Sequence, residues 1–168
     1  MEKFGLTLEP TKTKLVEFGR FAQRHAGKRG RNRPETIYFL GLTLYCTQNR
    51  KGNFKVGMRT EKSRLRRSLM SLQELMREIR HHTISNQVGE LNTVLRGHYA
   101  YYGVAGNIRA LFKVYRAVER YWRKMLCSRS WAGRRLTWDV FHQIKERTPL
   151  LQPKLRLPYR KLQALAVL

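Results

Sequence analysis

The chain has five histidines, the side chain best suited to proton transfer near neutral pH. His25 lies in a basic stretch, and His81 and His82 follow the apolar repeat of a predicted helix. His98 falls on the apolar side of a second predicted helix. No Asp or Glu is spaced to orient any of these four, so we expect them to have structural roles.

Carboxylates and cysteines are equally unsuited to a catalytic or metal site. Glu74 and Glu78 lie one helical turn apart beside Arg77, a pattern typical of a solvated face with local ion pairs. The only aspartate is Asp139, and the two cysteines lie far apart without a C-x-x-C pair. We therefore predict no catalytic residue, no cofactor and no metal.

The composition favours a nucleic-acid partner. Lys and Arg number 35 against 11 Asp and Glu, and a net charge of +24 on so small a body needs a polyanion. Arginines outnumber lysines 23 to 12, which favours bidentate phosphate contact over attraction to a membrane. A hydrophobic content of 42% indicates a folded core, but no apolar run approaches the roughly 20 residues of a membrane span. The N-terminus lacks a signal-peptide pattern, so a cytoplasmic location is expected.

The first third of the chain is predicted to be mainly β. Residues 15–18 alternate as in a short strand, and residues 20–33 are basic and aperiodic, as in a loop. Residues 36–46 are rich in β-branched and aromatic side chains, and residues 54–58 alternate between apolar and polar. A turn at residues 49–53 separates these two runs, so we predict a β-hairpin.

After this hairpin the apolar period becomes helical. Apolar residues recur at steps of three and four at Leu65, Leu69, Leu72, Met76 and Ile79, at Val88, Leu91 and Leu95, and at Leu111, Val118 and Trp122. We expect N-caps at Thr60, Ser85 and Asn107 for these three helices, and at Thr137 for a short distal helix. Prolines are expected to break the remaining chain. The predicted fold class is α+β, with a small β-hairpin, a three-helix bundle and a short distal helix.

Four ordered motifs follow one another along the chain. Residues 5–8 and 12–14 read GLTL and KTK, residues 39–41 read FLG, residues 95–104 read LRGHYAYYGV, and residues 136–138 read LTW. Together they resemble the motifs of group II intron-encoded reverse transcriptases with maturase function. The first is similar to the lysine motif near the nucleotide site of the polymerase, and the second to the F-L-G motif of its primer grip. The third resembles the signature of the maturase-specific X domain, and the fourth resembles its distal landmark.

This resemblance implies a domain order and a ligand. Residues 1–59 would be the C-terminal remnant of a polymerase palm, residues 60–148 the X or thumb domain, and residues 149–168 a proline-containing extension. The chain would bind group II intron RNA and assist its folding and splicing, with DNA as a second candidate ligand. Because the Y-x-D-D motif and the third metal-binding aspartate are missing, no polymerase activity of its own is expected. The alternative is a reverse transcriptase fragment whose palm is supplied by another chain.

The residues expected to contact RNA are mostly basic. The third predicted helix carries a basic, acid-free sector opposite its apolar face, whereas the charges in the outward sector of the first helix largely cancel. Tyr101 falls outside the apolar face of the second helix and could stack on a base, whereas Tyr102 falls on that face. Gly41 would admit a close approach, with Phe39 or Leu40 buried beside it. The predicted RNA-binding set is Lys12, Lys28, Arg29, Arg31, Arg33, Gly41, Arg96, Tyr101, Arg109, Lys113, Arg116, Arg120, Arg123, Lys124, Arg134 and Arg135.

Overall fold

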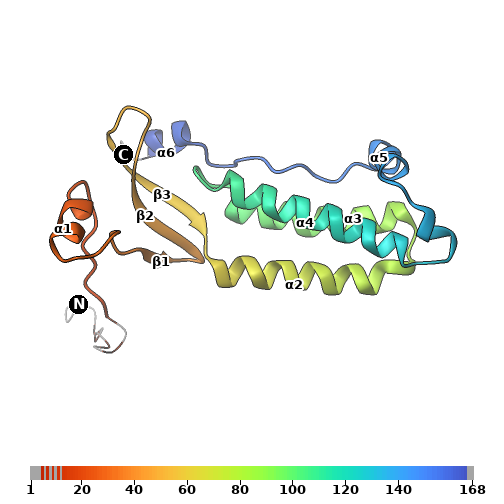
Figure 1. Ribbon diagram of the computed structural model, residues 1–168, viewed down its shortest axis with the longest axis horizontal. Helices are drawn as coiled ribbons and strands as arrows, with labels where there is room; N and C mark the ends of the chain where they lie inside the picture. Colours follow the sequence, from red (N-terminus) through yellow and green to blue (C-terminus); the bar gives the residue numbers. More distant parts are fainter. Residues whose placement is uncertain (1–4, 6, 8, 10, 12, 166–168) are drawn as a thin grey trace. The chain divides into compact units, whose positions relative to one another are not determined.

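The computed structural model describes residues 5, 7, 9, 11 and 13–165 (Figure 1). The fold class is α+β, as predicted, with a three-stranded antiparallel sheet and a helical bundle. The chain divides into two compact units, Met1–Phe39 with Thr43–Gly57, and Leu40–Leu42 with Met58–Leu168. Within the described residues, no helix combines the length and the apolar character that a membrane crossing requires.

The first unit contains a helix where the sequence predicted a loop. α1 (Ala22–Lys28) buries Ala22 and Ala26, which lie one turn apart. Two alanines produce no visible apolar period among so many basic residues, which is why the pattern was typical of a loop. The strand predicted at residues 15–18 is wrong, since residues 13–18 are irregular and Leu15 is 97% exposed. An alternating pattern forms a strand only where a partner strand and a buried face exist.

Three strands form the sheet, in the order β1 (Ile37–Phe39), β2 (Leu42–Gln48) and β3 (Phe54–Thr60). The predicted hairpin is confirmed as β2 and β3. Its turn is held by the Asn49 side chain, whose Oδ1 accepts hydrogen bonds from the backbone N–H groups of Lys51 and Asn53, each at 2.9 Å. Such an Asx turn explains why asparagine is suited to this position.

A second tight turn divides the run of residues 36–46, which the sequence predicted as one strand. Leu40 and Gly41 have φ angles of 47° and 71°, so two consecutive left-handed residues reverse the chain between β1 and β2. The expectation that Phe39 or Leu40 is buried is wrong, since the two side chains are 61% and 66% exposed. Leu40 lies in the turn itself, and Phe39 ends the edge strand β1, so little structure surrounds either side chain.

The second unit is built on three long helices, as predicted: α2 (Lys62–Glu78), α3 (Ile84–Tyr102) and α4 (Ile108–Cys127). They lie side by side in Figure 1, and a short 3₁₀ turn, η2 (Ile79–His81), continues α2. Their apolar faces meet in one core, in which the largest fully buried apolar side chains include Met76, Leu91, Leu95, Leu111 and Trp122. The three predicted apolar repeats therefore face inward, with Leu65 and Leu69 partly buried.

A buried glutamine joins these helices at one end. Gln87, which is 2% exposed, donates from Nε2 to the carbonyl oxygens of Arg80 and His82, at 3.0 and 2.9 Å. Its Oε1 accepts a hydrogen bond from Trp122 Nε1 at 2.8 Å. Both the nitrogen and the oxygen of the Gln87 carboxamide therefore have hydrogen-bond partners. The buried side chain fixes the η2 turn against α3 and α4 without leaving a polar group unpaired.

A second buried amide joins the end of β3 to the start of α4. Asn107 precedes α4, as predicted, but its side chain forms no cap. Its Oδ1 accepts from Thr60 N, and its Nδ2 donates to Thr60 Oγ1 and to Tyr102 O, each at 2.8 Å. Thr60 is the last residue of β3, and Glu61 takes the N-cap position of α2. The prediction that Thr60 caps α2 is therefore wrong.

Two hydroxyl caps set the ends of other helices. The cap of α3 is Thr83, whose side chain accepts from Asn86 N, and not the predicted Ser85. Both residues carry a hydroxyl, and an apolar period alone does not locate a helix start to within two positions. The distal helix is confirmed as α5 (Trp138–Arg147), with Thr137 as its cap.

The segment after α5 packs on the bundle and ends in a further helix. Leu150 is buried, and the Asn92 side chain of α3 accepts a hydrogen bond from Leu151 N at 2.6 Å. α6 (Tyr159–Leu165) follows Pro158 and was not predicted, because prolines were expected to break this part of the chain. Proline also suits the first turn of a helix, where its missing N–H and fixed φ cost nothing.

Candidate nucleic-acid interface

One face of α4 is a row of exposed basic side chains. While Val114, Val118 and Trp122 point into the core, the opposite face carries what we name the α4 basic stripe. Its members, all exposed, are Arg109, Lys113, Arg116, Arg120 and Lys124. They follow each other at steps of three or four residues, so at 1.5 Å per residue the stripe is about 22 Å long.

In the described part of the chain, no carboxylate neutralises this stripe. The only acidic residue of α4 is Glu119, and its carboxylate pairs with the Lys145 ammonium group of α5, with both side chains 17% exposed. Within the part of the chain that the structure describes, none of the ion pairs involves a stripe residue. The charges of the stripe therefore face solvent uncompensated, as an anionic backbone would require.

Arg123 lies apart from the stripe, although the sequence places it in the same outward sector. Its side chain is partly buried, Nη2 donates to the Leu136 carbonyl oxygen at 2.7 Å, and the guanidinium lies 4.4 Å from the centroid of the Trp138 ring. The chain that follows α4 folds back over this position, which a projection of one helix does not show. Arg123 therefore anchors the start of α5.

The outward sector of α2 mixes both charges, as predicted. Its members are all exposed: Arg67, Met70, Glu74, Arg77 and Glu78 of α2, and His81 of the η2 turn that continues it. Arg77 also forms a hydrogen bond within the bundle, in which its Nη2 donates to Tyr121 Oη at 3.3 Å. The charges do not cancel over the whole helix, because the first half of α2 also carries Lys62, Arg64 and Arg66.

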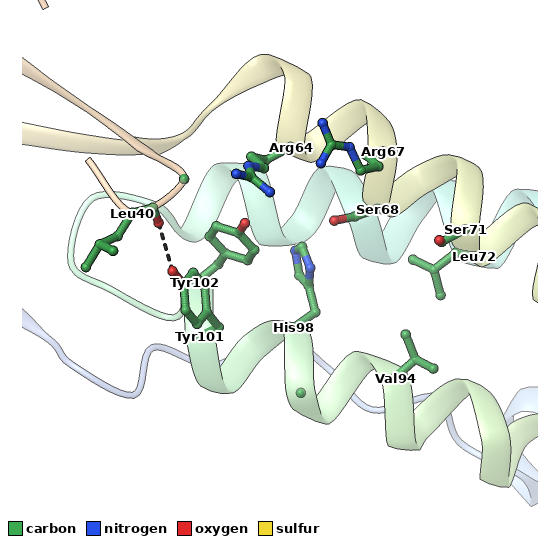
Figure 2. Close-up of a pocket in the computed structure, with 12 residues that line it drawn as sticks. Leu40, Arg64, Arg67, Ser68, Ser71, Leu72, Val94, His98, Tyr101 and Tyr102 are labelled. Carbon is green, nitrogen blue, oxygen red and sulfur yellow. Dashed lines mark hydrogen bonds between the residues drawn. The ribbon is translucent and has the colours of Figure 1, made fainter. Parts of the chain in front are cut away.

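A pocket of about 690 Å³ lies between the first half of α2 and the second half of α3 (Figure 2). From α2 it is lined by Arg64, Arg67, Ser68, Ser71 and Leu72, and from α3 by Val94, Gly97, His98, Tyr101 and Tyr102. Leu40 and Gly41 close one end. Both arginines are exposed, and none of the described residues that line the pocket is acidic. We name it the α2–α3 pocket.

Three rings gather at one end of this pocket. The ring of Tyr102 lies 4.7 Å from that of Tyr101 at 74° and 4.8 Å from that of His98 at 43°, measured between ring centroids. Tyr101 is 55% exposed, as predicted, and its hydroxyl donates to Leu40 O at 3.0 Å (Figure 2). A Cβ on Gly41 would lie 3.0 Å from the Tyr102 hydroxyl, so this glycine admits the close approach of Tyr102.

Burial favours the uncharged form of two of these rings. It lowers the pKa of the His98 imidazole and is the main cause that raises the pKa of the Tyr102 hydroxyl. His98 Nε2 is buried and has no hydrogen-bond partner among the described residues. The pocket thus combines neutral aromatic side chains with two guanidinium groups. Among the described residues, no cluster of three or more His, Cys, Asp or Glu is placed to bind a metal ion.

The basic residues predicted in the first unit are partly paired with acids. Arg29 lies 3.3 Å from a carboxylate oxygen of Glu17, and Arg31 lies 2.6 Å from one of Glu35. Lys28, the last residue of α1, and Arg33 are exposed. Lys12 lies outside the described residues. This segment therefore offers phosphates a less uniform charge than the α4 basic stripe.

The remaining predicted residues are exposed at other places. Arg96 lies on α3, and Arg134 and Arg135 lie in the 3₁₀ turn η3 (Ala132–Arg135). The Arg135 guanidinium lies 4.8 Å from the centroid of the Trp131 ring, and Trp131 is 69% exposed. Trp131, Arg134 and Arg135 add basic and aromatic surface beyond the end of α4.

The sequence did not single out most residues of the α2–α3 pocket. Ser68 and Ser71 lie one turn apart on α2, and Gly97 lies between Val94 and Tyr101 on α3. Small side chains on faces otherwise rich in large ones are the signal that could have indicated a hollow between two helices. The packing of these two faces against each other is tertiary structure, which the residue spacing within one helix does not predict.

The chain matches no known protein family, no curated protein and no solved structure.

Proposed function

We propose that the chain is an RNA-binding maturase domain that binds a group II intron and assists its folding and splicing, without polymerase activity of its own. The observation that carries this proposal is the α4 basic stripe, with five exposed cations and the one acid of the helix paired elsewhere. Arginine and lysine in such a row neutralise successive phosphates of a nucleic-acid backbone. The resemblance of residues 95–104 and 136–138 to the X domain narrows the ligand to group II intron RNA.

Assistance to folding follows from binding the folded RNA more tightly than its unfolded forms. A ligand that binds one state preferentially stabilises that state by mass action. A rigid helix is well suited to this role, because a stripe about 22 Å long favours RNA folds whose phosphates lie at matching positions. No chemical step is asked of the protein, since the RNA carries out the splicing reaction.

A direct test is to measure affinity for a folded group II intron and for an unrelated structured RNA of equal length at the same salt concentration. We expect the intron to be bound more tightly, and both affinities to fall steeply with salt because phosphates release counterions. Equal affinities would indicate a generic RNA-packaging protein. A flat salt profile would indicate a partner other than a nucleic acid.

One observation favours a second candidate, a fragment of an RNA-directed DNA polymerase completed by another chain. β1 is an edge strand of the sheet, and its Tyr38 and Phe39 are 69% and 61% exposed. An edge strand with exposed aromatic side chains can pair with strands of another chain. Co-purification with a separately made Y-x-D-D palm chain, and template-dependent DNA synthesis by the pair, would support this candidate.

A further inference from the structure

The α2–α3 pocket has the chemistry of a nucleotide site. Its rings offer π faces, and Tyr101 is held in place by its hydrogen bond to Leu40, so little ordering is needed when a ligand arrives. Arg64 and Arg67 lie on the opposite side of the pocket from Tyr101 in Figure 2, and both are exposed. A volume of about 690 Å³ falls within the range of roughly 300–1,000 Å³ that is typical of small-ligand sites.

Charge and shape together decide which part of a nucleic acid fits. The two guanidiniums and the absence of a lining acid favour an anion, and the rings favour a planar group next to that anion. In a duplex, bases are stacked inside and only edges and backbone are accessible, so a duplex does not fill a pocket between two helices. An unpaired nucleotide exposes both its base faces and its phosphate.

His98 adds a polar group that such a base could use. Figure 2 shows the imidazole projecting from α3 toward α2, and its Nε2 has no partner among the described residues. A neutral imidazole presents one donor and one acceptor, and base edges present both. A buried polar atom without a partner costs stability, so a ligand group that reaches it after a small ring rotation would gain a hydrogen bond.

We propose that the α2–α3 pocket binds a single unpaired nucleotide of the RNA, with its base against Tyr101 and Tyr102 and its phosphate at Arg64 and Arg67. This inference rests on the proposed RNA-binding function and assigns a second, base-dependent contact besides the phosphate contacts of the α4 basic stripe. The site would recognise unpaired positions in structured RNA and not a particular base sequence, because every base has a π face.

Glycine substitutions give a matched pair of variants for the test. Gly97 lines the pocket, and a Cβ built on it meets no atom within 4 Å, so Gly97→Leu fills the pocket without a backbone clash. Gly89, two turns earlier on α3, does not line this pocket and is equally open. Both changes replace a helix-interior glycine and raise helix propensity, so both variants should fold. Circular dichroism and thermal unfolding check this point.

The probes are three RNA hairpins that differ at one position of the stem. The first is fully paired, the second has one unpaired adenosine, and the third has an abasic nucleotide at the position of that adenosine. Fluorescence anisotropy should show the wild type binding the unpaired adenosine about 10-fold more tightly than either of the other two, as base stacking on aromatic side chains typically provides. Gly97→Leu should abolish this preference and bind the paired hairpin as the wild type does, whereas Gly89→Leu should keep it.

Several results would overturn the proposal. Equal wild-type affinity for the three hairpins, with a steep salt dependence, would leave RNA binding intact and assign the pocket to another occupant. A full adenosine preference in Gly97→Leu would place the base elsewhere. If the wild type binds none of the hairpins and no intron RNA, the proposed function itself fails, and the pocket assignment fails with it.

Discussion

Replacing Arg116, Arg120 and Lys124 by alanine should weaken RNA binding roughly 50- to 150-fold at 0.15 M salt. The three side chains are exposed and belong to the α4 basic stripe, without ion-pair partners in the described part of the chain. Each lost phosphate contact lowers the slope of log affinity against log salt by roughly 0.7–0.9. Between 0.15 M and 1 M salt, which is about 0.8 log units, three contacts correspond to about 1.7–2.2 log units of affinity.

The assay is a salt titration of binding to a folded group II intron by fluorescence anisotropy. The control replaces Arg24, Arg50 and Lys51, three exposed cations of the first unit, so that both variants lose the same charge. We expect the slope to fall by about two to three units in the α4 variant and by no more than about one unit in the control. Circular dichroism must show both folded, since basic side chains also cover apolar surface. Equal losses in two folded variants would refute the placement of RNA on α4.

Three further outcomes are expected. Supplied with template, primer, nucleotides and magnesium, the purified chain should synthesise no DNA, and template-dependent extension by a clean sample would contradict its assignment as a non-polymerase. Asn107→Ala should lower the free energy of unfolding in urea by about 2–4 kcal/mol, because it removes the buried partner of Thr60 N–H and of Thr60 Oγ1, whereas Tyr102 O keeps its hydrogen bond from Val104 N; a loss near zero would show that water replaces the amide. Burial lowers the pKa of His98, so on acidification the imidazole takes up a proton more readily in the unfolded chain than in the folded one. The free energy of unfolding should therefore decrease as the pH falls below about 6.5, the ordinary pKa of histidine. Urea unfolding from pH 7.5 to 5 should therefore show a smaller acid loss in His98→Phe than in the wild type, and parallel curves would contradict this.

The elements of the bundle were predictable because each long helix has one continuous apolar face. Leu91 and Leu95 of α3, and Leu111 and Val118 of α4, recur at helical spacing within their helices and are fully buried, so periodicity alone identified these faces. α1 was missed because only two alanines face inward, and the strand at residues 15–18 was predicted from alternation that no partner strand supports. Local pattern predicts an element well when burial of that element is extensive.

Only those features of the candidate interface that depend on a single helix could be predicted from the sequence. Arg116 and Arg120 face solvent as their angular positions require, whereas Arg123 is covered by the chain that returns from α4 to α5. The ion pair between Glu119 and Lys145 joins α4 to α5, so the sequence pattern of α4 alone could not predict it. The same holds for the α2–α3 pocket, which exists only because two helices pack with small residues between them.

The most direct test of the maturase assignment is the splicing rate of group II introns in the presence of the protein. A panel of introns from several structural classes would be measured at a magnesium concentration at which the RNAs alone splice slowly. We expect the wild type to accelerate splicing of at least one intron and the variant lacking Arg116, Arg120 and Lys124 not to do so. No acceleration of any intron by the wild type, or equal acceleration by the variant, would contradict the maturase assignment.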